Sequence, residues 1–274
     1  LVDLIVSHTN ADFDALASMV AASLLYPHAV MSLPGGMDRN VRDYLSLHGD
    51  VIPLVPPQEV PLERVTRLIV VETQHARRLG RFAALAERGT VPVILYDHHT
   101  PQAPTVRAAE THIAACGANT TLMLAFLQAR EIAIDPLQAT LFALGIYEDT
   151  GSLTFSTTTP EDVDAVAWLL RRGANLDEVS SYVNRSLTEQ QRRVFNQLLA
   201  TAEVHRIHGL QVLVATAQAA ETADELAILV HKLRDVEGSD AAMAVMPLDH
   251  AVLLVLRSSV DAINVAAIAR HFGG

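Results

Sequence analysis

The sequence has little cysteine, few basic residues and no long apolar run, and each shortage excludes a class of protein. Cys116 is the only cysteine in 274 residues, so no disulfide can form within the chain and a reducing cytoplasm is the expected compartment. The longest uncharged run, residues 15–37, contains Pro27, Pro34 and a Gly-Gly pair. This composition favours a helix, a turn and a strand over a membrane span. No signal peptide is recognisable.

Positive charge is also scarce. With 20 Lys and Arg against 31 Asp and Glu, the net charge is −11, which argues against a binding surface for extended duplex nucleic acid. Lys232 is the only lysine, which we interpret mainly as genome bias, with phosphate binding left to arginines at single positions. Half of the residues are hydrophobic, which is typical of a globular protein. A chain of this length usually forms more than one core, so two domains are expected.

The first half of the chain alternates short apolar runs with helical patterns, which predicts an α/β fold with an open, mostly parallel sheet and helices on both faces. The strand patterns cover residues 2–7, 28–33, 67–72 and 92–97, and the helical patterns 12–26, 38–48 and 76–88. Helical patterns dominate 118–200, with a capping box at Thr188 and Gln191. Strand patterns at 210–216, 240–248 and 251–257 predict a smaller α/β domain. We expect a first domain at 1–185, a linker helix at 186–204 and a second domain at 205–274.

Ionisable side chains follow three of the predicted strands, directly where each strand ends. In chain order they are His8, Asp12 and Asp14, then Glu72, then Asp97, His98 and His99. Ligands of open parallel sheets bind outside the carboxyl ends of the strands, so these side chains should meet in one crevice. The segment GIYEDTG (145–151) adds Glu148 and Asp149.

The composition of this cluster indicates a metal site. Histidines and several carboxylates without a thiolate suit Mn²⁺ or a similar divalent ion. Packed carboxylates repel one another unless a cation neutralises them, and two cations about 3.5–4 Å apart can hold a phosphoryl oxygen and activate water. Taken singly, His8 could be an ordinary polar residue, Asp12 and Asp14 helix caps, and Asp97 a turn former. Their joint occurrence in chain order favours the metal site.

The motifs resemble those of the DHH phosphoesterase family, which is named for the residues at 97–99. HTNADFDALAS (8–18), VVETQHARRLGR (70–81), DHH and GIYEDTG correspond to four family motifs, and VLRSSVDAINVAAIARHFGG (255–274) resembles the DHH-associated domain. The resemblance spans nearly the whole chain. It implies a manganese-dependent phosphoesterase of the RecJ-like and nanoRNase-like branch, an exonuclease-type hydrolase of phosphodiester or phosphomonoester bonds in short oligonucleotides or nucleotides.

The resemblance also implies a role for each motif residue. Two Mn²⁺ ions would be bound, and Mg²⁺ could replace them. His8 and Asp12 would bind one ion, and Asp14, His98 and Asp149 would bind the other. Glu72 would bind both. His99 would contact the scissile phosphate or protonate the leaving group, and Asp97 would orient a histidine. The substrate would bind in the cleft between the domains, where the associated domain would contribute Arg257, Ser258, Gly273 and Gly274.

Glu72 stands where the family usually has aspartate. The extra methylene adds one carbon–carbon bond of about 1.5 Å, whereas metal–ligand distances tolerate about ±0.2 Å. The sequence therefore predicts partial metal occupancy and weakened activity.

Two other functions stay open. GANTTLMLAF (117–126) and GIYEDTGSLTFSTTT (145–159) resemble the amino-terminal region of long bacterial proteins in which DHH domains precede CBS domains and a tRNA nucleotidyltransferase or poly(A) polymerase unit. Both ends of the sequence look like cuts from such a protein, in which this part would be a nucleotide-binding or RNA-binding regulatory module with weak or no hydrolysis. The same motifs occur in inorganic pyrophosphatases, but that branch has a lysine- and arginine-rich second domain, and the single lysine argues against it.

Overall fold

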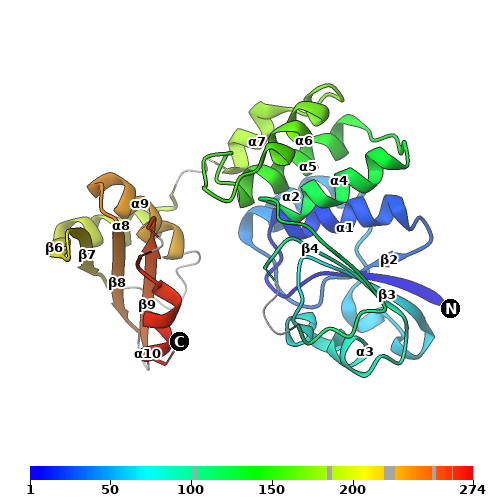
Figure 1. Cartoon of the computed structure of the whole chain (residues 1–274), viewed down its shortest axis with the longest axis horizontal. Helices are drawn as coiled ribbons and strands as arrows, with labels where there is room; N and C mark the ends of the chain where they lie inside the picture. The colour runs from blue at the N-terminus through cyan, green and yellow to red at the C-terminus, as the bar shows by residue number, and fades with distance from the viewer. Residues whose placement is uncertain (101–103, 184–186, 219–225, 249–250, 261, 274) are drawn as a thin grey trace. The chain divides into compact units, whose positions relative to one another are not determined.

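The computed structural model describes residues 1–100, 104–183, 187–218, 226–248, 251–260 and 262–273. The chain divides into two compact units, Leu1–Arg185 and Ser186–Gly274, and each is described by itself (Figure 1). None of the described helices combines the length and the apolarity that a bilayer-spanning helix needs.

The first unit is built on a sheet of five parallel strands. In spatial order they are β2 (Val30–Met31), β1 (Val2–Val6), β3 (Val65–Val71), β4 (Val93–Asp97) and β5 (Glu110–Ile113). Ile69 of β3 is in register with Ile5 of β1 and Ile94 of β4. Because β1, β3 and β4 are parallel neighbours, the residues that follow them leave the sheet at one edge.

Helices cover both faces of this sheet, which confirms the predicted α/β class (Figure 1). The helices are α1 (Phe13–Leu25), α2 (Arg39–His48), α3 (Ala83–Arg88), α4 (Asn119–Ala129), α5 (Pro136–Asp149), α6 (Pro160–Leu170) and α7 (Leu176–Val183), with short 3₁₀ turns η1 (Pro57–Glu59), η2 (Leu62–Arg64) and η3 (Ala76–Phe82). Successive side chains of β3 point to opposite faces of the sheet, as strand geometry requires. Ile69 and Val71 pack in one core with α1, α4 and α5, and Leu68 and Val70 pack in a second core with η3 and α3.

Three local features differ from the sequence prediction. The helix predicted at 76–88 is broken at Gly80, whose φ of 51° is left-handed and separates η3 from α3. The strand predicted at 28–33 is only two residues long. Strands β5 and β6 (Glu203–Ile207) were not predicted, because most of their side chains are exposed and carry no buried alternation.

The second unit has a four-stranded sheet in the order β6, β7 (Leu210–Thr216), β8 (Ala241–Pro247) and β9 (Val252–Ser258). β7 and β8 are parallel, and the outer pairs are antiparallel. Its helices are α8 (Glu189–Thr201), α9 (Leu226–Glu237) and α10 (Val265–His271). The sequence assigned residues 186–204 to a linker helix, and the helix found there, α8, contributes Val194 and Leu198 to the core of this unit.

Candidate metal centre

Histidine and carboxylate side chains come together at the carboxyl ends of β1, β3 and β4. Their ligand atoms form three overlapping groups, within each of which all atoms lie within 4.8 Å of one another. The groups are His8, Asp12 and Glu72; Asp14, Glu72, His98 and Asp149; and Glu72, His98 and His99. The structure thus brings together every side chain that the sequence nominated as a metal ligand, and Glu72 belongs to all three groups.

His8 and Asp12 form one half of the cluster, at the turn between β1 and α1. The His8 ring is 2 % exposed, and its Nδ1–H donates to the carbonyl of Thr9 at 2.8 Å, which leaves Nε2 facing the cluster. Asp12 is the N-cap of α1, where its Oδ1 accepts from the Ala15 N–H at 2.9 Å. Its other oxygen lies 4.0 Å from His8 Nε2. One carboxylate therefore caps the helix and also faces the cluster.

Asp14 is held at the start of α4. It is fully buried, and its two oxygens accept the backbone N–H groups of Asn119 at 2.7 Å and Thr120 at 2.8 Å. Burial and, next in size, the neighbouring charge of Asp149 together raise the pKa of Asp14 to about 7. Two backbone bonds fix the carboxylate, and each oxygen retains a lone pair for another partner.

His98 links Asp14 to the end of α5. Its Nδ1–H donates to the carbonyl of Cys116 at 3.0 Å, and its Nε2 lies 3.3 Å from Asp149 Oδ2 and 3.9 Å from Asp14 Oδ2. Burial alone would lower the pKa of His98, but the carboxylates of Asp149 and Asp14 raise it to about 10. The imidazole thus points one nitrogen at the backbone and the other at two carboxylates.

Glu72 stands between the two halves in an unusual backbone conformation. Its φ of 64° is left-handed, which is uncommon for a residue other than glycine, and its N–H donates to the Tyr96 carbonyl at 2.9 Å. Oε1 lies 4.0 Å from His98 Nε2 and 3.8 Å from His99 Nδ1, while Oε2 contacts His8 Nε2. Burial and the charges of the nearby aspartates raise the pKa of Glu72 well above its usual range.

The end of α5 reaches the cluster because α5 packs closely on α1 and α4. A Cβ at Gly145 would lie 2.6 Å from Thr120 Oγ1 and 3.0 Å from the Ala17 Cβ, so a larger side chain would force the helices apart. The two acids that follow have different roles. Glu148 Oε2 accepts from the Phe13 N–H at 2.6 Å at the start of α1, whereas Asp149 faces His98. The family resemblance named Asp149 as the ligand, and the helical pattern by itself does not distinguish the two acids.

Asp97 and His99 form a hydrogen-bonded pair beside the cluster. Asp97 is fully buried, and its Oδ1 accepts from the His99 backbone N–H at 3.0 Å and from Nδ1–H at 2.8 Å. Burial would raise the pKa of Asp97, but these hydrogen bonds outweigh it and lower the pKa. The same bond raises the pKa of His99, whose side chain is 50 % exposed. Gln74, to which the sequence gave no role, donates from Nε2 to the His99 carbonyl at 2.9 Å.

The donor set of the cluster fits divalent cations. Among the described residues, the buried Nε2 atoms of His8 and His98 and the Oε2 of Glu72 make no hydrogen bond of ordinary geometry, although His8 Nε2 touches Glu72 Oε2 and His98 Nε2 faces Asp149. Unsatisfied buried polar atoms are rare in folded proteins and call for an explanation such as an ion. A cation would give these atoms a partner and would remove the repulsion that raises the pKa values of Asp14 and Glu72.

The residues nominated for substrate binding lie in the second unit. Arg257 is exposed at the end of β9, and its Nη1 donates to the Leu256 carbonyl at 3.0 Å. The Ser258 hydroxyl donates to the Val260 carbonyl at 2.9 Å. Gly273 follows α10 with a φ of 88°, and Gly274 lies outside the described residues. Their contact with a substrate stays a prediction.

Sequence comparisons place the chain among known proteins. The profile of the N-terminal domain of the DHH family matches residues 4–146. An A-adding tRNA nucleotidyltransferase of Geobacter sulfurreducens is 41 % identical over 273 residues, which cover 99 % of this chain and 31 % of that protein. Another from Aquifex aeolicus is 29 % identical over 271 residues, covering 99 % and 32 %. The chain thus spans about a third of the length of these relatives.

Two solved structures share the fold. An exopolyphosphatase-related protein from Bacteroides fragilis superposes with a TM-score of 0.74 at 15 % identity, covering 94 % of this chain and 79 % of the other. A putative family II inorganic pyrophosphatase from Methanococcus jannaschii gives a TM-score of 0.58 at 16 % identity, covering 98 % and 99 %. At these identities the likeness concerns the fold.

Proposed function

Because the chain belongs to the DHH family, we propose that it is a metal-dependent phosphoesterase that hydrolyses short oligonucleotides or nucleotides. The observation that carries the proposal is the buried cluster at the sheet edge, in which the Nε2 atoms of His8 and His98 face several carboxylates. The names of the two fold neighbours concern the cleavage of phosphoanhydride bonds. Mn²⁺ is the ion that we propose, since a mixed imidazole and carboxylate site without thiolate suits it.

Two cations would be held by the cluster. His8 and Asp12 would bind one, the group around Asp14 and His98 would bind the other, and Glu72 would contribute to both. When bound, the cations would supply positive charge at the phosphoryl oxygens and favour the deprotonation of water. The protein orients its own ligands in advance. The carbonyls of Thr9 and Cys116 fix the two histidine rings by their Nδ1–H groups.

His99 is the proposed proton donor. Its Nδ1–H is engaged by Asp97, so Nε2 is the nitrogen that remains for the substrate. The hydrogen bond to Asp97 raises the pKa of His99, which favours the protonated form that a general acid needs. Nε2–H would deliver its proton to the leaving oxygen as the P–O bond breaks, which leaves a neutral imidazole whose Nδ1–H still donates to the Asp97 carboxylate. The Gln74 bond to the His99 carbonyl holds this residue in place.

The relatives favour a second candidate function. They are named A-adding tRNA nucleotidyltransferases, and this chain corresponds to about a third of their length. In a protein of that kind the two units would form a nucleotide-binding or RNA-binding module, in which the cluster binds metal and phosphate without efficient turnover. Arg257 and Ser258 would contact the nucleotide in either case.

A substrate panel tests the proposal. The chain is loaded with Mn²⁺ and incubated with a dinucleotide, adenosine 3′,5′-bisphosphate, a cyclic dinucleotide and pyrophosphate, and the products are separated by chromatography. We expect cleavage of the dinucleotide or the bisphosphate, abolished by chelator and reduced roughly a hundredfold by His98→Ala. His28→Ala is the matched control, because His28 is exposed and lies outside the cluster.

Two outcomes separate the candidate functions. Metal binding with tight nucleotide binding and no product from any of the four compounds would favour the module and overturn the phosphoesterase. Arg257→Ala should raise KM for a cleaved nucleotide while the Mn²⁺ affinity stays unchanged. An unchanged KM would remove Arg257 from the proposed substrate site.

A further inference from the structure

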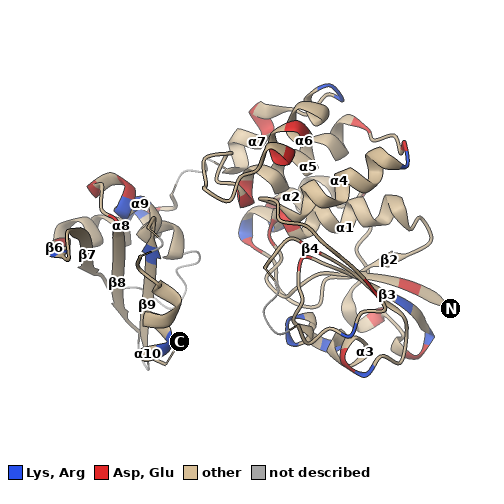
Figure 2. Ribbon diagram, viewed as in Figure 1, with Lys and Arg blue, Asp and Glu red and all other residues tan. Residues whose placement is uncertain are grey.

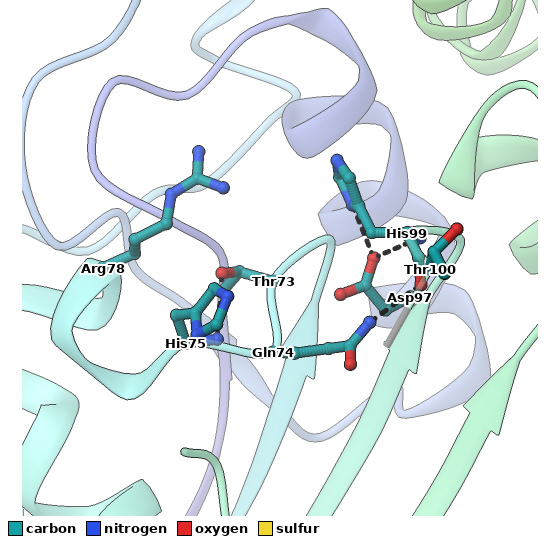
Figure 3. A pocket seen from close by; sticks show the side chains of 7 residues that line it. All are labelled: Thr73, Gln74, His75, Arg78, Asp97, His99 and Thr100. Carbon is teal, nitrogen blue, oxygen red and sulfur yellow. Dashed lines mark hydrogen bonds and ion pairs between the residues drawn. The ribbon is translucent and has the colours of Figure 1, made fainter. Parts of the chain in front are cut away.

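A pocket lies beside the metal centre, on the side of His99. It has a volume of about 320 Å³, near the lower end of the range for small-molecule sites, so it suits part of a nucleotide (Figure 3). The residues that line it include Thr73, Gln74, His75, Arg78, Asp97 and His99. They come from the segments that follow β3 and β4, and the proposed reaction uses only the last two directly.

Arg78 is the unexplained residue of this pocket. It is half-buried, yet among the described residues its guanidinium makes no hydrogen bond or ion pair. Its backbone is fixed at both ends, because the Arg78 N–H donates to the His75 carbonyl at 2.9 Å and its carbonyl accepts from Thr9 at 2.8 Å. In Figure 3 its guanidinium stands across the pocket from the His99 ring. A fixed, partly buried cation without a partner indicates an anionic ligand.

The carboxylates near the pocket are already engaged. Asp97 accepts two hydrogen bonds from His99, and Glu72 contacts His8 and faces His98. The segment η3 carries three arginines, Arg77, Arg78 and Arg81, and Figure 2 shows basic residues near α3 with acidic residues among them. Once cations occupy the cluster, they and the Arg78 guanidinium would offer two separate binding points for anionic groups at the pocket. A ligand with two anionic groups would match this arrangement better than a ligand with one.

We propose that Arg78 binds a second phosphate of the substrate, one that is not cleaved, in a subsite that lies wholly within the first unit. This proposal rests on the proposed function, because the cluster is taken to hold the other phosphate. The substrate class is therefore a nucleoside that carries phosphate on two positions, either as a bisphosphate or as part of a short oligonucleotide. A guanidinium suits this task because it can donate two parallel hydrogen bonds to phosphate oxygens.

The test compares affinities rather than rates. Binding of adenosine 3′,5′-bisphosphate, 3′-AMP and 5′-AMP to the full chain is measured by calorimetry with Ca²⁺ replacing Mn²⁺, and the absence of hydrolysis is checked by chromatography. We expect the unmodified chain to bind the bisphosphate at least tenfold more tightly than either monophosphate, about 1.4 kcal/mol. Arg78→Ala should remove this preference, and Arg78→Lys should restore part of it. Arg77→Ala is the matched control, because Arg77 is exposed and does not line the pocket.

Three outcomes of the binding experiment would refute the Arg78 subsite. The subsite is refuted if the unmodified chain shows no preference for the bisphosphate, if the preference survives in Arg78→Ala, or if Arg77→Ala removes it equally. Loss of the preference in Arg257→Ala but not in Arg78→Ala would assign the second phosphate to the second unit. Failure of the proposed function looks different. A chain that prefers the bisphosphate through Arg78, yet cleaves nothing in Mn²⁺, keeps the subsite and loses the phosphoesterase.

Discussion

Replacing Glu72 by aspartate tests the metal centre at the residue that its two halves share. From the sequence alone, aspartate is expected to improve the site, because the family usually has aspartate there. The structure gives a reason to expect the opposite. Glu72 has a left-handed backbone, and its two oxygens face different halves, Oε1 towards His98 and Oε2 towards His8.

The magnitude follows from the length of the side chain. Aspartate would withdraw the carboxylate by one carbon–carbon bond, about 1.5 Å, which is several times the tolerance of about 0.2 Å in metal–ligand distances. The backbone cannot easily follow, because the N–H of Glu72 is bonded to the Tyr96 carbonyl of the neighbouring strand. Even changes beyond the direct ligands cost 10–100-fold in metal affinity. We therefore expect the second ion to bind with at least tenfold lower affinity, which corresponds to about 1.4 kcal/mol.

The assay is a Mn²⁺ titration followed by calorimetry and by electron paramagnetic resonance, which detects spin-coupled pairs. Glu72→Asp is compared with Glu72→Gln, which keeps the length and removes the charge, and with Glu87→Asp at an exposed position. Both changes at Glu72 should abolish the coupled signal, and the Glu87 change should leave it intact. Two coupled ions of unchanged affinity in Glu72→Asp would refute the reasoning from the backbone. Tighter binding and faster turnover would support the expectation from the sequence that glutamate weakens the site.

Three further predictions concern the surroundings of the centre. In the metal-free protein the pKa of Asp14 is raised to about 7 from 3.8, so the folded state favours the protonated carboxyl. The stability that Asp14 contributes is therefore fully present below about pH 4 and is lost as the pH rises through about 7. Melting temperature in chelator should therefore fall between about pH 5 and pH 8, and Mn²⁺ should remove this difference; a melting temperature that rises over this range would contradict the prediction. Gln74→Met should lower kcat without changing Mn²⁺ stoichiometry, since it removes only the bond to the His99 carbonyl, and an unchanged kcat would exclude a positioning role. Glu148→Gln should keep both metal binding and stability. Glu148→Ala should lower the free energy of unfolding in denaturant by about 1 kcal/mol, because the Phe13 N–H loses its acceptor. Loss of a metal ion in the glutamine variant would show that Glu148 is a ligand.

The general position of the cluster could be predicted because parallel strands leave a sheet at the same edge. His8, Glu72 and Asp97 each follow an apolar run, and strand patterns alone were enough to place them near one another. The strands that the prediction missed lack that signal. β5 has one partly buried and three exposed residues, and every residue of β6 is exposed, so neither shows the alternation that identifies a strand.

The finer assignment within each motif could not be predicted from strand and helix patterns, because neighbouring residues of one type diverge in space, and only the family resemblance favoured Asp149 over Glu148. Successive residues of a helix point about 100° apart. Of the two acids at the end of α5, Glu148 therefore reaches the start of α1 while Asp149 reaches His98. The same holds in η3, where Arg77 is exposed and Arg78 lines the pocket. A motif names the segment that carries the chemistry, but the packing of α5 on α1 and the bond between Arg78 and Thr9 decide which side chain enters the site.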